Sequence, residues 1–150
     1  MNNELKKIII YTDGACSQNP GPGGYAAVLI YDDSKKEISG SEKSTTNNRM
    51  EILAVVKALE LLKYPCEVEV HSDSAYVVNS IEKGWIYKWR LNNWITSSKE
   101  KVKNIDLWER MLEYLDIHSI KFIKVKGHST DEYNNRCDYL AKEAIKDLIK

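Results

Sequence analysis

The chain has few of the features that mark secreted, zinc-binding or membrane proteins. Its three cysteines, Cys16, Cys66 and Cys137, are odd in number and show no metal-ligand spacing. This argues against a disulfide framework and a zinc site and favours free thiols in a reducing compartment. No apolar run approaches the roughly 20 residues that a membrane-spanning helix needs, and no apolar segment of signal-peptide type opens the chain. We therefore expect a cytoplasmic protein without membrane contact.

An excess of one charge is also missing, since 22 Lys and Arg balance 22 Asp and Glu. Zero net charge is unfavourable for nucleic-acid binding, because basic proteins gain affinity by releasing counterions from phosphates. The segment 83–103 is an exception, because aromatic residues alternate there with basic ones, and its one acid is Glu100. These residues are Lys83, Trp85, Tyr87, Lys88, Trp89, Arg90, Trp94, Lys99, Lys101 and Lys103. Such a segment suits a sugar–phosphate backbone; the alternative is a solvated helix whose tryptophans pack on the domain.

The 150 residues are enough for one domain with a hydrophobic core, and no linker or repeat divides them. Residues 8–11 form a near-continuous apolar run, which is typical of a strand buried on both faces. We predict strands at about 7–12, 25–31, 37–44, 67–72 and 119–125, and helices at about 48–63, 74–90 with a break near Gly84, 106–116, and from 133 onward. Three strands joined by hairpins, then alternating helices and strands, predict an α/β fold with a mixed five-stranded sheet flanked by helices.

Four acidic residues lie in distinctive local sequences. They are Asp13 in Tyr11-Thr12-Asp13-Gly14, Glu51 in Asn47-Asn48-Arg49-Met50-Glu51, Asp73 in His71-Ser72-Asp73-Ser74, and Asp138 in Asn135-Arg136-Cys137-Asp138. Clustered carboxylates repel one another and destabilise the folded state unless something neutralises them. Hard divalent cations such as Mg²⁺ take oxygen ligands, and two of them can act on both sides of a phosphoryl transfer. The four acids are therefore candidates for a metal site.

Each acid also has an ordinary structural alternative. Asp13 and Asp73 end predicted strands, where sites in α/β sheets usually lie, but they could be a turn residue and a helix N-cap. Glu51 projects from the sheet-facing side of its predicted helix, but it could form a capping box with Asn48. Asp138 lies at the edge of an apolar helical stripe, where an ordinary boundary residue would fit. The four sequences together are hard to explain by chance.

The ordered motifs resemble type 1 ribonuclease H of the bacterial kind over roughly residues 7–148. The matching segments are 11–24, 45–51, 72–74, 104–108, 125–128 and 134–138. The resemblance implies the ribonuclease H-like fold and a monomeric endonuclease that hydrolyses the RNA strand of RNA–DNA hybrids, leaving 5′-phosphate and 3′-hydroxyl ends. It implies that the four acids bind two Mg²⁺ ions, for which Mn²⁺ can substitute. One ion would activate water and the other would stabilise the leaving 3′-oxygen.

The resemblance also implies roles for residues around the acids. His128 would assist proton transfer or product departure, as suits a group of pKa near 6.5; the alternative is a solvated loop histidine. Ser129-Thr130-Asp131 follows it, where many members have glycine and another histidine or polar residue. Substrate-binding roles are implied for Cys16, Asn19, Thr46, Asn47, Asn48, Trp85, Lys88, Trp89, Arg90 and Asn134. The short amides supply donors and acceptors for 2′-hydroxyls, although Asn47 and Asn48 could simply cap a helix.

Two rival functions stay open at this point. One is a nuclease of the same fold that acts on branched DNA, against which the groove asparagines and the basic segment argue. The other is a hybrid-binding module without catalysis. The four intact acids argue against that module, because pure binding would gain from removing negative charge near phosphates.

Overall fold

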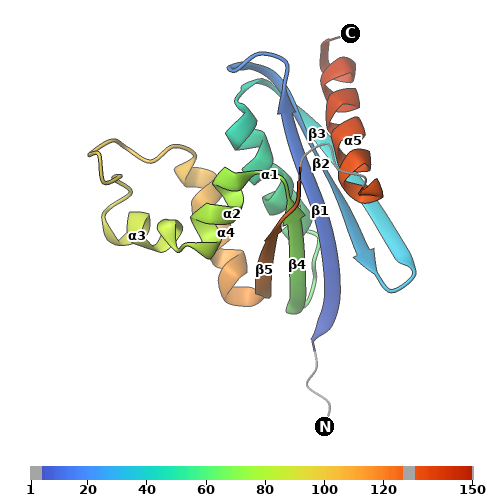
Figure 1. Ribbon diagram of the computed structural model, residues 1–150, viewed down its shortest axis with the longest axis horizontal. Helices are drawn as coiled ribbons and strands as arrows, with labels where there is room; N and C mark the ends of the chain where they lie inside the picture. Colours follow the sequence, from blue (N-terminus) through green and yellow to red (C-terminus); the bar gives the residue numbers. More distant parts are fainter. Residues whose placement is uncertain (1–4, 127–130, 150) are drawn as a thin grey trace.

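The computed structural model describes residues 5–126 and 131–149, and a five-stranded sheet lies at its centre (Figure 1). The strand order is β3-β2-β1-β4-β5. β1 pairs with β2 and β2 with β3 in antiparallel fashion, whereas β4 lies parallel to both β1 and β5. The strands are β1 (Lys6–Cys16), β2 (Gly21–Tyr31), β3 (Ser34–Thr45), β4 (Cys66–Ser72) and β5 (Ser119–Lys124). The predicted mixed sheet of five strands is confirmed.

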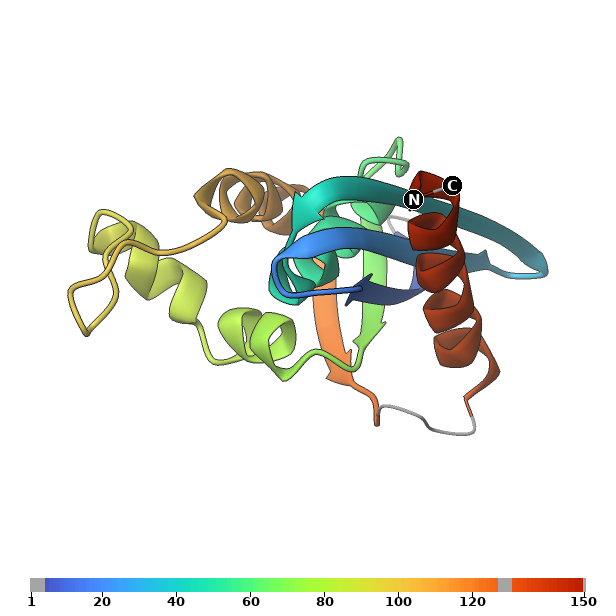
Figure 2. The same ribbon diagram turned by 90° about the horizontal axis from the view of Figure 1, so that it is seen from above.

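Helices cover both faces of this sheet (Figures 1 and 2). They are α1 (Asn47–Leu59), α2 (Ala75–Glu82), α3 (Trp85–Leu91), α4 (Ile105–Ile117) and α5 (Glu132–Ile149). The helices α1, α2 and α4 lie on one face and α5 on the other, while α3 and the loop after it project away from the sheet. Within the described ranges, no helix combines the length and the hydropathy that crossing a bilayer would require.

The predicted elements are present with several shifted boundaries, since β2 begins at Gly21 and β3 at Ser34, four and three residues earlier than predicted. The break near Gly84 is confirmed, because Gly84 has a φ of 75° between α2 and α3. The helix predicted to reach Lys63 ends at Leu59. There, the N–H groups of Leu61 and Leu62 bond three residues back, which tightens the chain into a turn ahead of Pro65. The first strand is longer than predicted, since β1 continues through Asp13 to Cys16.

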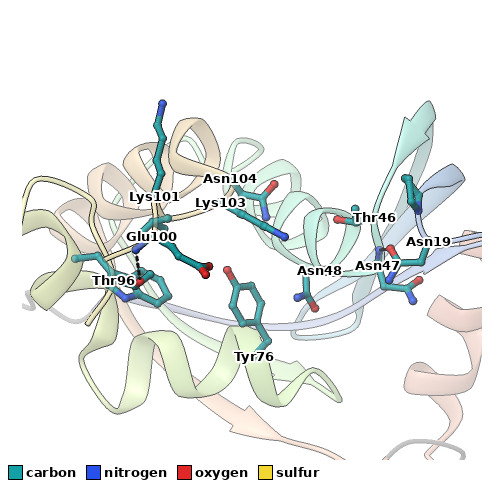
Figure 3. A pocket seen from close by; sticks show the side chains of 13 residues that line it. Asn19, Thr46, Asn47, Asn48, Tyr76, Thr96, Glu100, Lys101, Lys103 and Asn104 are labelled. Carbon is teal, nitrogen blue, oxygen red and sulfur yellow. Dashed lines mark hydrogen bonds between the residues drawn. The ribbon is translucent and has the colours of Figure 1, made fainter. Parts of the chain in front are cut away.

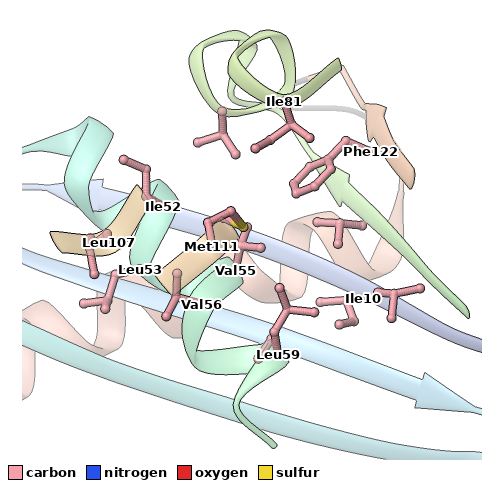
Figure 4. Close-up of a cluster of buried hydrophobic side chains, with 14 of the residues drawn as sticks. Ile10, Ile52, Leu53, Val55, Val56, Leu59, Ile81, Leu107, Met111 and Phe122 are labelled. Carbon is pink, nitrogen blue, oxygen red and sulfur yellow. The ribbon is translucent and has the colours of Figure 1, made fainter. Parts of the chain in front are cut away.

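The main hydrophobic core fills the space between the sheet and the helices α1, α2 and α4 (Figure 4). Ile10 of β1, Met50 of α1, and Trp108 and Met111 of α4 are completely buried there. Full burial of such side chains contributes roughly 1.5–3 kcal/mol each. This packing holds α1 and the central strand β1 in a single rigid arrangement.

A smaller apolar cluster holds α5 against the opposite face. Ala26 and Val28 of β2 meet Cys137 and Ala141 of α5, and all four are completely buried. Gly24 of β2 adds to the close approach, because a Cβ there would collide with the carbonyl oxygen of Ala141. The small residues let α5 lie directly on the sheet. This close packing fixes the distance between the sheet and the side chains that α5 carries.

Candidate active site

Three of the four predicted acids converge at one end of the parallel part of the sheet. Asp13 comes from β1, Glu51 from the second turn of α1, and Asp73 from the residue after β4. One carboxylate oxygen of each lies within 4.8 Å of those of the other two. Asp13 and Glu51 are only 6% and 9% exposed. Folding therefore brings residues from distant parts of the chain into one largely buried acidic cluster.

The position of Asp13 differs from the prediction that it ends a strand. Its backbone pairs with Ala26 of β2 inside β1, so it is not a turn aspartate. The parallel pairing of β1 with β4, however, ends at Tyr11 and His71. Asp13 and Asp73 therefore lie just beyond the last paired residues, where the two strands separate and leave room for a site.

Gly14 explains how α1 comes close enough to place Glu51 beside Asp13. A Cβ on Gly14 would lie 2.5 Å from both the backbone nitrogen of Glu51 and the carbonyl carbon of Met50. Any side chain at this position would push α1 away from β1. The glycine of the Asp13-Gly14 pair therefore has a packing role that supports the acid cluster.

The capping alternatives for Glu51 and Asp73 are wrong. Thr46 caps α1, because its Oγ1 accepts the N–H of Arg49 at 3.2 Å. Ser74 caps α2, because its Oγ accepts the N–H of Val77 at 3.2 Å. Both acids are therefore free of capping, and Glu51 Oε1 is buried without a hydrogen-bond partner among the described residues.

Burial and mutual repulsion shift the protonation of the cluster. Burial, followed by the charges of Asp73 and Asp138, raises the pKa of Asp13 to about 8, although the N–H of Gly14 opposes the shift. Burial, and then the charges of Asp13 and Asp73, raise the pKa of Glu51 well above its ordinary value. The cluster without a cation therefore holds protons near neutral pH that a solvated carboxylate would have lost.

Asp138 flanks the cluster and does not belong to the tight group of three. Its charge acts on Asp13, and its side chain hydrogen-bonds with that of Asp13. Its Oδ2 also lies 3.1 Å from Nζ of Lys142, one turn further along α5. The sequence analysis missed this pair, although the spacing of four residues on a helix is the signal for it.

The donors of the cluster fit a hard divalent cation. Asp13, Glu51 and Asp73 offer only carboxylate oxygens, which are the ligands that such ions prefer. The unpartnered buried oxygen of Glu51 supports the fit, because a buried polar atom is unfavourable unless something binds it. These three residues can hold a cation that would also relieve their repulsion.

A groove brings together five of the ten predicted substrate-binding residues, namely Asn19, Thr46, Asn47, Asn48 and Trp89. A pocket of about 570 Å³, named here the groove pocket, has Asn19, Thr46, Asn47 and Asn48 on one side (Figure 3). The other side consists of the loop before α4, whose lining residues are Thr96, Glu100, Lys101, Val102, Lys103 and Asn104; Tyr76 and Trp89 also line the pocket. The sequence analysis did not assign a groove role to Tyr76 or Asn104, which no charge pattern distinguishes.

A hydrogen bond joins two of the groove asparagines. The side-chain oxygen of Asn19 accepts the N–H of Asn47 at 3.2 Å, which joins the loop after β1 to the start of α1. Asn47 and Asn48 are exposed, and neither is the cap of α1. The half-buried thiol of Cys16 donates to backbone carbonyls, including that of Thr45 at 3.4 Å.

The basic segment divides into packed and exposed residues. The ring of Trp89 lies 5.8 Å from that of Trp108, so this tryptophan does pack on the domain, as the structural alternative proposed. Trp85 is half-buried, whereas Lys88 and Arg90 of α3 are exposed. The exposed cations are therefore carried on a surface that projects from the sheet.

The start of α5 accounts for one departure from the family pattern. Asp131 Oδ1 accepts the N–H groups of Tyr133 at 3.0 Å and Asn134 at 3.2 Å, as an N-cap residue does. The Asn134 side chain is buried, with 4% of the residue exposed. The predicted catalytic His128 lies outside the described residues.

Comparison with known proteins gives matches over nearly the whole chain. The family model described as RNase H matches residues 5–146. A protein named Ribonuclease H from Caldicellulosiruptor saccharolyticus is 58% identical over 144 residues, which covers 96% of this chain and 99% of that protein.

Solved structures agree with these matches. LC11-RNase H1, solved in complex with an RNA/DNA hybrid, is 29% identical with a TM-score of 0.69, covering 95% of this chain and 99% of that one. LC9-RNase H1, described as a type 1 RNase H with the type 2 active-site motif, has a TM-score of 0.86 at 24% identity, covering 98% of this chain and 75% of that one. The second likeness concerns the fold alone.

Removing one charge from the cluster should flatten the pH dependence of stability. The pKa of Asp13 is about 8 in the folded protein and about 3.9 when unfolded. Because the folded state holds this proton more tightly, the free energy of unfolding in EDTA should fall as pH rises from about 4 to about 8. Asp13→Asn should lose this contribution and be at least as stable as the wild type at pH 8, by urea unfolding.

Exposed Asp116 on α4 supplies the control, since Asp116→Asn should keep the wild-type pH dependence. Addition of Mg²⁺ should raise the melting temperature of the wild type more than that of Asp13→Asn. A strongly destabilised Asp13→Asn protein in EDTA would show that Asp13 is chiefly a structural residue.

A methyl group at Gly14 should separate Asp13 from Glu51. Gly14→Ala should lower stability by about 1–3 kcal/mol through overpacking, and it should greatly reduce the rise in melting temperature that Mg²⁺ produces. Gly40→Ala is the matched control, because a Cβ there also makes a close contact, but with the ring of Tyr25 and not with the backbone of α1. An unchanged response of Gly14→Ala to Mg²⁺ in thermal melts would contradict the packing role.

Proposed function

The chain belongs to the RNase H family, and from this membership we propose that it is an endonuclease for the RNA strand of RNA–DNA hybrids. The products would carry 5′-phosphate and 3′-hydroxyl ends. The observation that carries the proposal is the convergence of Asp13, Glu51 and Asp73 within 4.8 Å, with Glu51 on the helix α1 whose start lines the groove pocket. The hybrid bound to LC11-RNase H1 supports the choice of substrate.

We propose that Asp13, Glu51, Asp73 and Asp138 hold two Mg²⁺ ions, or Mn²⁺ in their place. Such ions, when bound, lower the pKa of a nucleophilic water and stabilise charge on the leaving 3′-oxygen. Asp13 and Glu51 must give up the protons that their raised pKa values retain in the cluster. Asp138 must share its carboxylate with the nearby ammonium group of Lys142.

The remaining residues would bind and orient the hybrid. Asn19, Thr46, Asn47 and Asn48 supply short polar side chains at one wall of the groove pocket, where 2′-hydroxyls and phosphates need donors and acceptors. Cys16 and Asn134 would contribute further contacts to the hybrid. Trp85, Lys88, Trp89 and Arg90 would hold the DNA strand, and His128 would assist proton transfer or product departure.

We propose that the chain acts as a single domain over residues 1–150, as a monomer, in the cytoplasm.

The substrate assignment predicts a specific pattern of cleavage. The purified protein with Mg²⁺ or Mn²⁺ should cut labelled RNA in a hybrid and spare duplex DNA, single-stranded RNA and branched DNA. Excess EDTA should abolish the activity. Equal cleavage of the DNA strand, or cleavage that persists in EDTA, would overturn the proposal. Binding of the hybrid without any cleavage would favour the rival of a hybrid-binding module.

The exposed cations of α3 should contribute to affinity through phosphate contacts. Replacing Lys88 and Arg90 together with Ala should raise KM and reduce the slope of log K against log salt by about one to two, with a much smaller effect on kcat. Lys35 and Lys36, exposed at the far end of β3 from Thr46, are the matched control pair. A collapse of kcat with unchanged KM and salt slope would contradict the assignment.

A further inference from the structure

We propose that Arg49 is a positioning residue that holds the two walls of the groove pocket at a fixed separation and so sets the affinity for the hybrid. The proposal rests on the proposed function, because the hybrid is the ligand whose binding it explains. The groove wall consists of Asn19, Thr46, Asn47 and Asn48, and the loop wall consists of residues 96–104. Arg49 is adjacent in sequence to the first wall, and its side chain reaches the second.

The guanidinium group of Arg49 is bonded at all three of its nitrogens. Nε donates to Glu42 Oε1 of β3 at 3.2 Å. Nη1 donates to Asp106 Oδ1 at 3.0 Å and to Asn104 Oδ1 at 3.3 Å, while Nη2 donates to Asp106 Oδ2 at 2.8 Å. The two parallel bonds to Asp106 form the paired geometry that arginine makes with a carboxylate, which fixes direction as well as distance.

The backbone and the side chain of Arg49 therefore act on opposite walls. Its N–H is bonded by the cap residue Thr46, which belongs to the groove wall. Its side chain holds Asn104, which ends the loop wall with a φ of 64°. Left-handed backbone is uncommon for residues other than glycine, although asparagine adopts it more readily than most, and a hydrogen bond to its side chain constrains it there. Arg49 supplies part of that constraint.

Electrostatics gives a second reason for a role in binding. The side chain of Asp106 is 64% exposed and that of Glu42 is 33% exposed. Both would repel approaching phosphates if they were unpaired. The hydrogen bond from Arg49, more than any other cause, lowers the pKa of Asp106, so this carboxylate is ionised and paired at neutral pH. Arg49 neutralises these acids, so that the exposed charges of the loop wall are the three cations Lys99, Lys101 and Lys103 and the single acid Glu100.

The helices α1 and α4 are joined by a second arginine, so Arg49 is not needed merely to hold these two helices together. Arg110 of α4 forms an ion pair with Glu60, at the far end of α1 from the groove pocket. The helices α1 and α4 also share the main core through Leu53, Trp108 and Met111. The two arginines thus make comparable links between one pair of elements, but only Arg49 lies at the groove.

The test compares Arg49→Met, Arg49→Lys and Arg110→Met in steady-state cleavage of a labelled hybrid. Arg49→Met should raise KM about tenfold with kcat within about twofold, because the walls are displaced and the acids unmasked while the metal ligands stay in place. The KM of Arg49→Lys should lie between those of the wild type and Arg49→Met, since lysine keeps the charge but not the forked geometry. Arg110→Met should leave KM unchanged, whatever its effect on the melting temperature.

Asp106→Asn separates positioning from simple charge. Removing an exposed negative charge would by itself tighten binding of a polyanion. Positioning by the Arg49–Asp106 pair predicts the opposite, a severalfold increase in KM, and no further increase when Asp106→Asn is combined with Arg49→Met. Faster amide hydrogen exchange across residues 96–104 in both variants should accompany the change, as a readout that does not depend on activity.

Several results would overturn the proposal. One is an unchanged KM in Arg49→Met, and another is a lower KM in Asp106→Asn. A third is a collapse of kcat in Arg49→Met at unchanged KM, which would mean that Arg49 positions Glu51. A wild-type protein that cleaves no hybrid would overturn the proposed function itself. The exchange measurement on residues 96–104 would then still decide whether Arg49 orders the loop wall.

Discussion

Folding takes Asp13 and Glu51 out of water and places them against each other and against Asp73, and this repulsion is the constraint on which the structure depends. No local preference of the chain would hold three carboxylates together. The main core between the sheet and α1 supplies the free energy that keeps them in place. The result is an arrangement that is strained without a cation and relaxed with one. A metal-dependent enzyme needs this, because binding energy is then coupled to the geometry of the site.

Close approach of backbones is the second requirement, and glycine meets it at two points. Gly14 lets α1 lie on β1, and Gly24 lets α5 lie on β2. Each contact sets the position of one acid relative to Asp13, because Glu51 is carried by α1 and Asp138 by α5. The acids of the cluster are therefore positioned by residues that have no side chain, and a search limited to reactive groups would overlook them.

The sequence predicts the mixed sheet, the order of its elements and the identity of the acids, because these depend on periodicity and on motifs that are local in the chain. It does not predict the capping of α1 by Thr46 or of α2 by Ser74. Several neighbouring residues can cap each helix, and the choice among them changes the stability of the helix by at most about 2 kcal/mol. It also places Asp13 at the end of a strand. The strand in fact continues because β2 stays paired with it as far as Cys16, a long-range contact that local patterns do not encode. The link of Arg49 with Asp106 is likewise visible only in three dimensions, whereas the spacing of Asp138 and Lys142 on one helix is a local signal that could have predicted their pairing.

A chain of zero net charge can bind a polyanionic ligand because several of its acids are paired with arginines within the fold. Glu42 and Asp106 are paired with Arg49, Glu37 with Arg136, and Glu60 with Arg110, so three arginines are used within the fold. Exposed cations remain on α3 and on the loop wall, opposite a groove wall of uncharged polar residues. Affinity for a hybrid then depends on the local field and on the separation of the groove walls more than on total charge. Formal charge alone is therefore a poor guide to nucleic-acid binding in a domain where three of the four arginines are already paired with acids.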